Sequence, residues 1–264
     1  MANILNQLAD RARFRVSEEK KKVPLQEIRR QAEALSSDTG FPFEKALAQD
    51  GISFICEVKK ASPSRGLIAP DFPYREIARE YEKAGASAIS CLTEPEYFLG
   101  SSRYLQEIAG AVSIPVLRKD FTVDPYMIYR AKVLGASAVL LICAILSEEQ
   151  IKEGIQVADS LGLSALVEAH DSGQVEMALR AGARIVGVNN RDLRDFTVDI
   201  HNSTRLRSLV PPEVLFVSES GIRTPEDVAE LYRSGTNAVL IGETLMRSKD
   251  KAGELLKLRS HCRG

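Results

Sequence analysis

The chain has 264 residues, of which 27% are charged and 44% hydrophobic, and its formal net charge is −1. This balance excludes a disordered polyelectrolyte and gives no overall basic surface for nucleic acid. No run approaches the about 18 apolar residues that a membrane helix needs, and charges interrupt residues 1–14 where a signal peptide would be apolar. We therefore expect a cytoplasmic protein that binds a small molecule, not a membrane or nucleic acid.

Residues 1–50 precede the first predicted strand and are expected to form an N-terminal helical extension. Their apolar spacing predicts three helices, at residues 4–14, 25–35 and 43–49. The polar segment 17–24 is interpreted as a linker, with its three consecutive lysines in a solvated turn. Because the extension is too small for an independent domain, we expect it to pack on residues 51–264 and to help cover one mouth of that domain.

A short pattern then recurs about every 50 residues, which indicates a repeated structural unit. In each copy a glycine follows a helical pattern and precedes an apolar, β-branched run; the glycines are Gly85, Gly135, Gly182 and Gly235. Glycine just past a helix is typical of a left-handed cap, and the run behind it is typical of a strand buried on both faces. Four helix-to-strand connections are thus predicted.

A second set of apolar runs lies between these connections, and together the two sets predict eight strands. The strands are expected to start near residues 53, 87, 115, 138, 164, 185, 214 and 238. Amphipathic segments between them predict helices at residues 74–83, 125–134, 148–160, 173–180 and 225–233, the last with Thr224 as N-cap. Eight βα units favour a (β/α)₈ TIM barrel over an open doubly wound sheet, whose G-x-G-x-x-G turn is missing after the first strand.

Ionisable residues end the odd-numbered predicted strands. They are Glu57 and Lys59 on the first strand, Lys119 on the third, Glu168 on the fifth and Glu219 on the seventh. Strand alternation puts Glu57 and Lys59 on one face and Phe54, Cys56 and Val58 on the other. In a barrel these charges would converge at the C-terminal mouth, where a dry cavity can shift lysine and glutamate pKa values toward neutrality. The pattern predicts a Lys–Glu proton-transfer site.

Two glycine-containing turns follow the seventh and eighth predicted strands, at Ser220-Gly221 and at Gly242. In a barrel these loops commonly bind phosphate through backbone N–H groups. Glu243 is an awkward neighbour for a phosphate, so we expect its side chain to point away.

Polar residues also follow the sixth and first strands. Asn189 and Arg191 offer hydrogen bonds and a fork for a carboxylate, or else form an ordinary polar loop with an Asx turn. Segment 62–66 is either a simple turn or a second polar wall. The four cysteines, Cys56, Cys91, Cys143 and Cys262, are interpreted as thiols of a reducing compartment, with the first three buried, and the dispersed His170, His201 and His261 predict no metal site.

With these residues in view, the chain resembles the indole-3-glycerol phosphate synthase family over almost its whole length. The resemblance is carried by EVKKASPSRG (57–66), SCLTEPEYFLGS (90–101), LRKDF (117–121), LVEAH (166–170), GVNNRDL (187–193) and VSESGI (217–222). It implies a TIM barrel with extra N-terminal helices and a carboxy-lyase (EC 4.1.1.48) of tryptophan biosynthesis. The implied substrate, 1-(2-carboxyphenylamino)-1-deoxyribulose 5-phosphate, undergoes ring closure and loses CO₂ and water, without metal or organic cofactor.

The resemblance also implies roles for individual residues. Lys119 is the general acid on the ketone oxygen, Glu168 is the acid–base group, and Lys59 contacts substrate; whether Lys59 or Glu168 serves the dehydration stays open. Glu57 and Asn189 complete the polar floor, and Glu219 and Ser220 line the mouth. The substrate positions are Arg191 and Ser62 for the carboxylate, Gly221, Leu240 and Gly242 for the phosphate end, and Phe121 and Leu193 for the aromatic ring.

Two other functions remain open at this point: a phosphate-binding sugar isomerase of the same fold, and a barrel that only binds a phosphorylated ligand. The isomerases use an Asp–Asp or Cys–Asp pair where this chain has Glu57, Lys59 and Glu168. We expect a monomer rather than an obligate oligomer, with possible association with other tryptophan-pathway enzymes.

Overall fold

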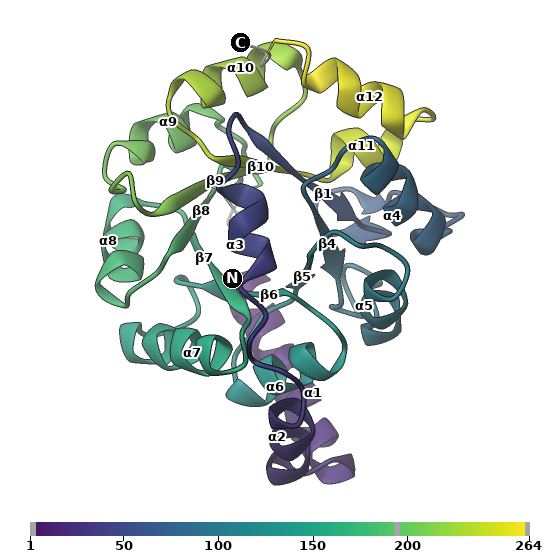
Figure 1. Cartoon of the computed structure of the whole chain (residues 1–264), viewed down its shortest axis with the longest axis vertical. Coiled ribbons are helices and arrows are strands. Elements are labelled where there is room, and N and C mark those ends of the chain that lie inside the picture. Colours follow the sequence, from purple (N-terminus) through teal and green to yellow (C-terminus); the bar gives the residue numbers. More distant parts are fainter. Residues whose placement is uncertain (1–3, 193–195, 262–264) are drawn as a thin grey trace.

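A computed structural model describes residues 4–192 and 196–261 of the chain. Within these residues, eight parallel strands close a barrel in the order β1-β10-β9-β8-β7-β6-β5-β4 (Figure 1). The barrel strands are β1 (Ser53–Val58), β4 (Ala88–Leu92), β5 (Val116–Lys119), β6 (Ala138–Ile142), β7 (Ser164–Ala169), β8 (Ile185–Asn189), β9 (Leu215–Glu219) and β10 (Ala238–Ile241). The predicted TIM barrel is confirmed, and the predicted strand starts agree with it to within one residue.

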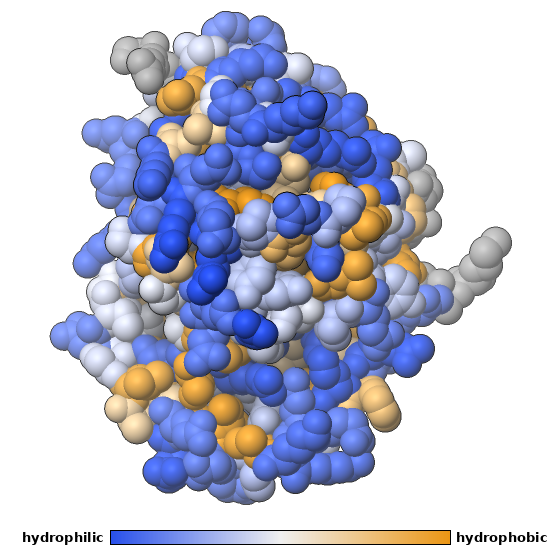
Figure 2. Space-filling model, turned by 90° about the vertical axis from the view of Figure 1, so that its right-hand side faces the viewer, coloured by the Kyte–Doolittle hydropathy of each residue, from blue (hydrophilic) through white to orange (hydrophobic). Residues whose placement is uncertain are grey.

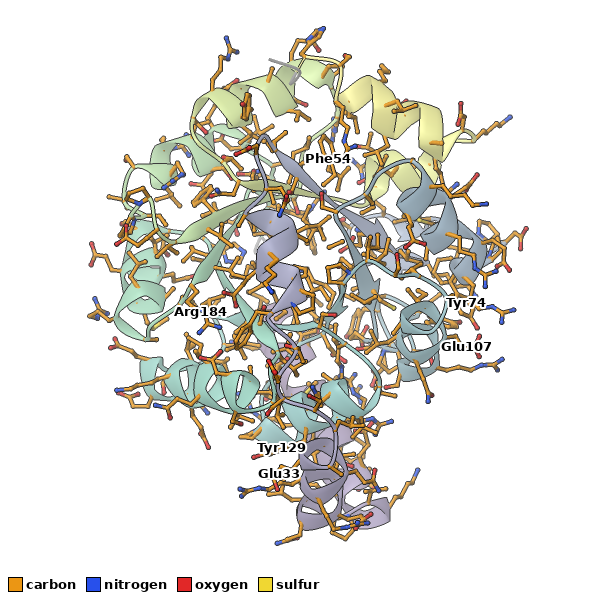
Figure 3. The ribbon with its side chains drawn as sticks, viewed as in Figure 1. Glu33, Phe54, Tyr74, Glu107, Tyr129 and Arg184 are labelled. Carbon is orange, nitrogen blue, oxygen red and sulfur yellow. The ribbon has the colours of Figure 1, made fainter. Side chains whose placement is uncertain are left out.

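Helices surround the barrel and separate its strands along the chain (Figure 1). They are α4 (Tyr74–Lys83), α5 (Ser102–Ala109), α6 (Pro125–Val133), α7 (Glu148–Ser160), α8 (Ser172–Arg180), α9 (His201–Arg207), α10 (Pro225–Arg233), α11 (Glu243–Arg247) and α12 (Lys251–Leu258). The predicted N-cap is confirmed, because Thr224 and Asp227 form a capping box at the start of α10. Neighbouring helices are also tied by side chains: Tyr74 of α4 donates to Glu107 of α5 at 2.7 Å, and both are labelled in Figure 3.

The four repeated glycines have the left-handed conformation that the sequence predicted. Their φ angles are +90° at Gly85, +84° at Gly135, +89° at Gly182 and +84° at Gly235. Each turns the chain from the end of a helix into the next strand, and an L side chain would be strained there. The sequence repeat is therefore a repeat of this backbone turn.

Two apolar layers hold the barrel together. Phe54, Cys56 and Val58 of β1 belong to the layer between the strands and the helices, whereas Ile55 belongs to the barrel interior. This alternation is the predicted one, and it directs Glu57 and Lys59 toward the barrel axis. On the face that Figure 2 shows, hydrophilic side chains cover most of the surface and apolar ones form separate patches.

The N-terminal helices close both ends of the barrel. Helix α3 (Pro42–Leu47) buries Phe43 and Leu47 completely against the barrel interior, at the N-terminal ends of the strands (Figure 1). There Glu44 accepts a hydrogen bond from Ser164 at 3.0 Å and pairs with Arg184 at 2.8 Å. At the other end, α1 (Ile4–Lys22) lays Leu5, Leu8 and Ala12 over the C-terminal mouth. Helix α2 (Leu25–Glu33) packs beside α6.

The expected linker at residues 17–24 is wrong, because α1 continues through all three lysines to Lys22. Lysine and glutamate are good helix formers, and basic residues in a last turn interact favourably with the helix dipole. The turn is also anchored: Lys20 Nζ lies 2.6 Å from Asp124 Oδ2, and Glu19 Oε2 lies 2.7 Å from Arg130 Nη1. The chain leaves the helix just before Pro24, which cannot continue the backbone hydrogen-bond pattern.

A two-stranded hairpin that the sequence did not predict follows β1. It consists of β2 (Ala61–Ser62) and β3 (Gly66–Leu67), and Ser62, Pro63 and Ser64 in and beside it line the cavity described below. Segment 62–66 is therefore both a turn and a polar wall. Within the described parts of the chain, no helix is long and apolar enough to cross a membrane.

Candidate active site

A cavity of about 360 Å³ opens at the C-terminal ends of the barrel strands, beneath α1. The register of the parallel strands brings the strand ends together at the rim of this cavity. Lys119 is paired with Leu92, Glu168 with Gly187, and Asn189 with Glu219. Every sequence-selected site residue that the structure describes lines this one cavity: Glu57, Lys59, Ser62, Lys119, Phe121, Glu168, Asn189, Arg191, Glu219, Ser220, Gly221, Leu240 and Gly242. Leu193 lies outside the described residues.

Lys119 lies between two buried carboxylates at the floor of the cavity. Its Nζ is 3.4 Å from Glu168 Oε2 and 3.5 Å from Glu219 Oε2. Burial alone would lower the pKa of Lys119, but the carboxylates of Glu219, Glu168 and Glu57 outweigh it and raise that pKa. Lys119 therefore remains an ammonium group throughout the neutral range and can donate a proton or a hydrogen bond to a developing oxyanion.

The two carboxylates have opposite pKa shifts. Burial raises the pKa of Glu219 to about 8, against the attraction of Lys119 and with the help of the neighbouring Glu168 charge. Burial also opposes ionisation of Glu168, but Lys119, His170 and the Asn189 side chain together lower its pKa. The expected shift of pKa toward neutrality thus occurs at Glu219, but the expectation is wrong for Glu168 and Lys119. One ammonium group is shared by two carboxylates, and it fully stabilises the anionic form of only one of them. At neutral pH the site holds a carboxylate base beside a protonated carboxylic acid.

Glu57 and Lys59 form a second ion pair at the end of β1. Gly242 leaves the space that this pair occupies: a Cβ atom there would overlap the Glu57 carboxylate and lie 2.9 Å from Lys59 Nζ. Gly187 does the same for Glu219, because its Cβ would overlap Glu219 Oε1 and lie 3.1 Å from Leu166 Cδ1. Both glycines are thus required sterically by the charged groups opposite them.

The loop after β8 supplies Asn189 and Arg191. Asn189 Oδ1 accepts the Arg191 N–H at 3.0 Å, so the Asx turn is present, and the Asn189 side chain helps to lower the pKa of Glu168. The Arg191 side chain is largely buried, donates to the Phe196 carbonyl at 3.3 Å and faces Glu243 at 3.8 Å. This arrangement leaves a fixed guanidinium facing the cavity.

The loops after β9 and β10 meet at the same rim. Ser220 and Gly221 both have left-handed backbone conformations, with φ angles of +69° and +83°. Asn190 holds this turn, because its Nδ2 donates to the Ser220 carbonyl and to Ser218 Oγ, each at 3.0 Å. Strain at a non-glycine residue such as Ser220 is typical of functional turns. Thr244 Oγ1 donates to the Ile222 carbonyl at 2.7 Å and joins the two loops.

Glu243 belongs to the cavity lining, and its carboxylate is engaged by arginine side chains. It lies among three arginines, with Nε of Arg65 at 3.1 Å, Nε of Arg247 at 3.2 Å and Nη2 of Arg191 at 3.8 Å. These cations offset its charge, so the loop region is not acidic despite the glutamate.

Apolar side chains cover the opposite wall of the cavity. Phe121 follows Lys119 and Asp120 along the chain, and its ring centroid is 6.1 Å from that of Phe98. Ile4 and Leu8 from α1 complete this wall. The cavity therefore has an apolar side under α1, a charged floor, and a polar rim at the last two barrel strands.

His170 and Phe98 are cavity neighbours that the sequence analysis did not select. His170 Nε2 lies 3.7 Å from Glu168 Oε1, and both ring nitrogens are buried without a hydrogen-bond partner among the described residues. The signal for His170 was its place in the sequence, because it directly follows β7, the strand that carries Glu168. Phe98 sits in a long loop, where no periodic pattern points to the cavity.

Comparison with known proteins identifies the relatives of this chain. A family model described as indole-3-glycerol phosphate synthase matches residues 5–258. A protein of that name from Ruminiclostridium cellulolyticum is 58% identical over 256 residues, covering 97% of this chain and 98% of the relative. Another from Endomicrobium trichonymphae is 54% identical, covering 97% and 99%.

Solved structures show similarity of fold at low identity. A thiamine phosphate pyrophosphorylase from Pyrococcus furiosus aligns with a TM-score of 0.59 and 16% identity, covering 79% of this chain and 94% of that one. A mandelate oxidase variant aligns with a TM-score of 0.60 and 18% identity, covering 80% and 75%. At such identities the likeness concerns the barrel alone.

Proposed function

This chain belongs to the indole-3-glycerol phosphate synthase family, and from that membership we propose which of its residues carry out each step of the reaction. As a carboxy-lyase of tryptophan biosynthesis (EC 4.1.1.48), it converts 1-(2-carboxyphenylamino)-1-deoxyribulose 5-phosphate to indole-3-glycerol phosphate. The reaction closes a five-membered ring and releases CO₂ and water. The observation that carries the residue assignment is the Lys119 ammonium group fixed between Glu168 and Glu219 on the floor of one cavity.

In the first step, the aromatic carbon that bears the carboxylate attacks the ketone carbon. We assign Lys119 to the ketone oxygen, because an ammonium group there stabilises the alkoxide as it develops and gives it a proton. The raised pKa of Lys119 keeps the proton available before attack. Loss of CO₂ then restores the aromatic ring and leaves the hydroxyl group on the former ketone carbon, which is now part of the five-membered ring.

In the last step, a proton and the hydroxyl group leave as water. Glu168 suits the base, because its lowered pKa keeps it ionised at neutral pH. Lys59 suits the proton donor to the departing hydroxyl group, because it faces the same cavity and its ammonium group is fixed there by an ion pair with Glu57. Asn189, which lines the same cavity, helps to keep Glu168 ionised by lowering its pKa.

The ends of the substrate fit opposite sides of the cavity. We propose that Arg191 and Ser62 bind the carboxylate and that the Gly221 and Gly242 loops, with Leu240 beneath them, bind the phosphate end. Support comes from the guanidinium of Arg191 at the rim and from the joined, glycine-containing loops after β9 and β10, the usual phosphate position in such barrels. The aromatic ring then lies against Phe121, with Ser220 and Glu219 beside the reacting carbons.

Other properties are proposed on narrower grounds. We propose a cytoplasmic enzyme, supported by three free, buried cysteines: Cys56, Cys91 and Cys143. We also propose one domain with residues 1–50 as its extension, active as a monomer that can associate with other tryptophan-pathway enzymes.

The test is conversion of the synthetic substrate by the purified chain, followed by indole fluorescence. The chain contains no tryptophan, so the product signal is not masked. We expect equal amounts of indole product and CO₂. Turnover without dependence on Lys119, Glu168 or Lys59 would refute the residue assignment while leaving the family membership intact.

A further inference from the structure

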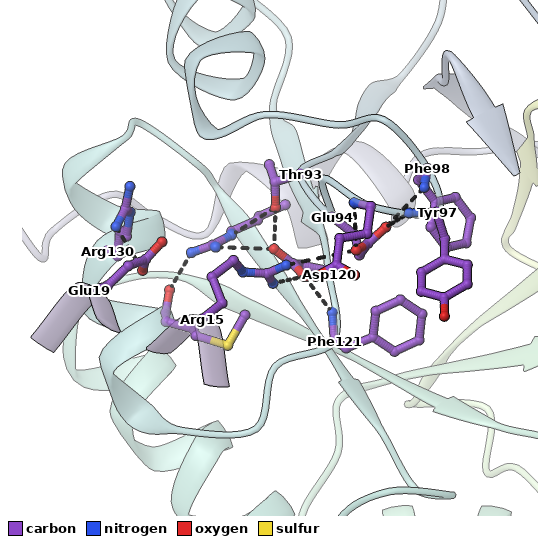
Figure 4. Close-up of polar contacts among 12 residues, drawn as sticks. Arg15, Glu19, Thr93, Glu94, Tyr97, Phe98, Asp120, Phe121 and Arg130 are labelled. Atoms are coloured by element: carbon purple, nitrogen blue, oxygen red, sulfur yellow. Dashed lines mark hydrogen bonds and ion pairs between the residues drawn. The ribbon is translucent and has the colours of Figure 1, made fainter. Parts of the chain in front are cut away.

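Arg15, on helix α1, joins two buried carboxylates beside the cavity. Its Nη2 lies 2.6 Å from Asp120 Oδ1 and its Nη1 lies 4.0 Å from Glu94 Oε1 (Figure 4). The Arg15 side chain is 19% exposed, whereas those of Asp120 and Glu94 are 0% and 2% exposed. A single guanidinium fork therefore spans two acids that come from different loops.

Asp120 fixes the backbone on which Phe121 stands. Its Oδ1 accepts the Phe121 N–H at 2.9 Å, and its Oδ2 accepts Thr93 Oγ1 at 2.5 Å and Arg118 Nη2 at 3.2 Å. Burial would raise the pKa of Asp120, but Arg118 and Arg15 outweigh it and lower that pKa. Asp120 is thus a fully bonded anion directly after Lys119, and Arg15 supplies one of its charge-assisted bonds.

Glu94 fixes the backbone on which Phe98 stands. Its Oε2 accepts the N–H groups of Tyr97 at 2.7 Å and Phe98 at 2.9 Å, and its Oε1 accepts the Glu96 N–H at 2.9 Å (Figure 4). The loop after β4 therefore folds around one carboxylate. This loop places Phe98 on the apolar wall of the cavity, where its ring centroid is 6.1 Å from that of Phe121.

We propose that Arg15 is a positioning residue for the aromatic ring of the substrate: it holds Asp120 and Glu94 together and thereby sets the spacing of Phe121 and Phe98. The inference rests on the proposed function, which puts the ring against Phe121. It gives helix α1 a definite part in recognising the substrate, although Arg15 itself is not in the cavity lining.

Two other ion pairs of α1 provide a matched control. Lys20 pairs with Asp124 and Glu19 with Arg130, at 2.6 and 2.7 Å, so they too attach α1 to the barrel. Neither pair touches the carboxylates that hold Phe98 and Phe121. A variant at Lys20 therefore loosens the attachment of α1 without acting on the aromatic wall.

The experiment compares Arg15→Met, Arg15→Lys and Lys20→Met by steady-state kinetics and by binding of two ligands, indole-3-glycerol phosphate and the ringless glycerol 3-phosphate. For Arg15→Met we expect the KM to rise about tenfold and kcat to change less than about threefold, because contacts made equally in ground and transition states affect KM alone. The Kd for indole-3-glycerol phosphate should rise in step, and that for glycerol 3-phosphate should not change. Arg15→Lys should recover part of the loss, since the charge returns without the fork.

Three results would overturn the inference: a normal KM in both Arg15 variants, an equal KM rise in Lys20→Met, or equal weakening of both ligands. If Arg15→Met does not fold, Arg15→Lys decides through the same measurements. Phe121→Ala distinguishes failure of the proposed ring position from failure of the proposed role of Arg15. A normal KM in Phe121→Ala refutes the proposed ring position itself, whereas a raised KM there with normal Arg15 variants refutes only the role of Arg15.

Discussion

Replacing Lys119 by methionine tests the charged floor of the cavity, because it removes the ammonium group and keeps an unbranched side chain of similar length. Loss of a positioned proton donor costs about 10²- to 10⁴-fold in rate. At about 1.36 kcal/mol for each factor of ten, this corresponds to roughly 2.7–5.4 kcal/mol in the activation free energy. We therefore expect kcat to fall by at least about 100-fold, measured by indole fluorescence, with Lys152→Met on the exposed face of α7 as control.

The same substitution should change how stability depends on pH. Without the cation 3.4 and 3.5 Å away, Glu168 and Glu219 lie together in a buried site, and the folded-state pKa of Glu168 rises above its unfolded value. A carboxyl group with a raised folded-state pKa stabilises the fold fully below the unfolded pKa and loses that contribution as pH rises. The unfolding free energy of the variant should thus fall, relative to the native chain, as the pH rises above about 4.5.

Urea unfolding at several pH values measures this difference. Stability curves that stay parallel to those of the native chain would refute the buried-charge argument. Turnover within about fivefold of the native rate would remove Lys119 from its proposed role as general acid.

Three further predictions follow from other parts of the structure. Arg191→Ala should raise the KM for substrate more than it lowers kcat, because Arg191 is proposed to bind the carboxylate; an unchanged KM would make it a loop residue. Glu219→Gln should reduce the loss of unfolding free energy between pH 4.5 and about 8, because the native Glu219 holds its proton to about pH 8 and stabilises the fold only while protonated. Urea unfolding across that pH range measures the loss, and a pH dependence equal to that of the native chain would contradict the prediction. Phe43→Ala, at the N-terminal end of the barrel, should lower the unfolding free energy by about 3–5 kcal/mol while kcat at 25 °C stays near native; a parallel loss of kcat would show that this end of the barrel is coupled to the site.

The repeat of helix, glycine and strand could be predicted from the sequence because its causes are local. A glycine with positive φ, a capping box such as Thr224 with Asp227, and a β-branched run each act within a few residues. Where tertiary contacts decided the local structure, the prediction failed. Residues 17–24 were interpreted as a polar linker, but helix α1 continues to Lys22, and pairs of Glu19 with Arg130 and of Lys20 with Asp124 add to the helix propensity of these residues.

The candidate site divides in the same way. Lys119, Glu168 and Glu219 could be selected from the sequence, because charges at the ends of buried strands stand out against their apolar surroundings. Phe98 and Arg15 could not be selected. Their parts depend on Glu94 and Asp120, which act through backbone N–H groups and a guanidinium that only the folded chain brings together.

By itself, therefore, the sequence determined the barrel, the order of its strands, the identity of the rim residues and the resemblance to a family. The tertiary structure decided the charge states at the floor of the cavity. The same residue type, glutamate, has a lowered pKa at position 168 and a pKa of about 8 at position 219. That difference comes from burial and from the sharing of one ammonium group, and the energies of buried charges depend on distances in space that no pattern along the chain contains.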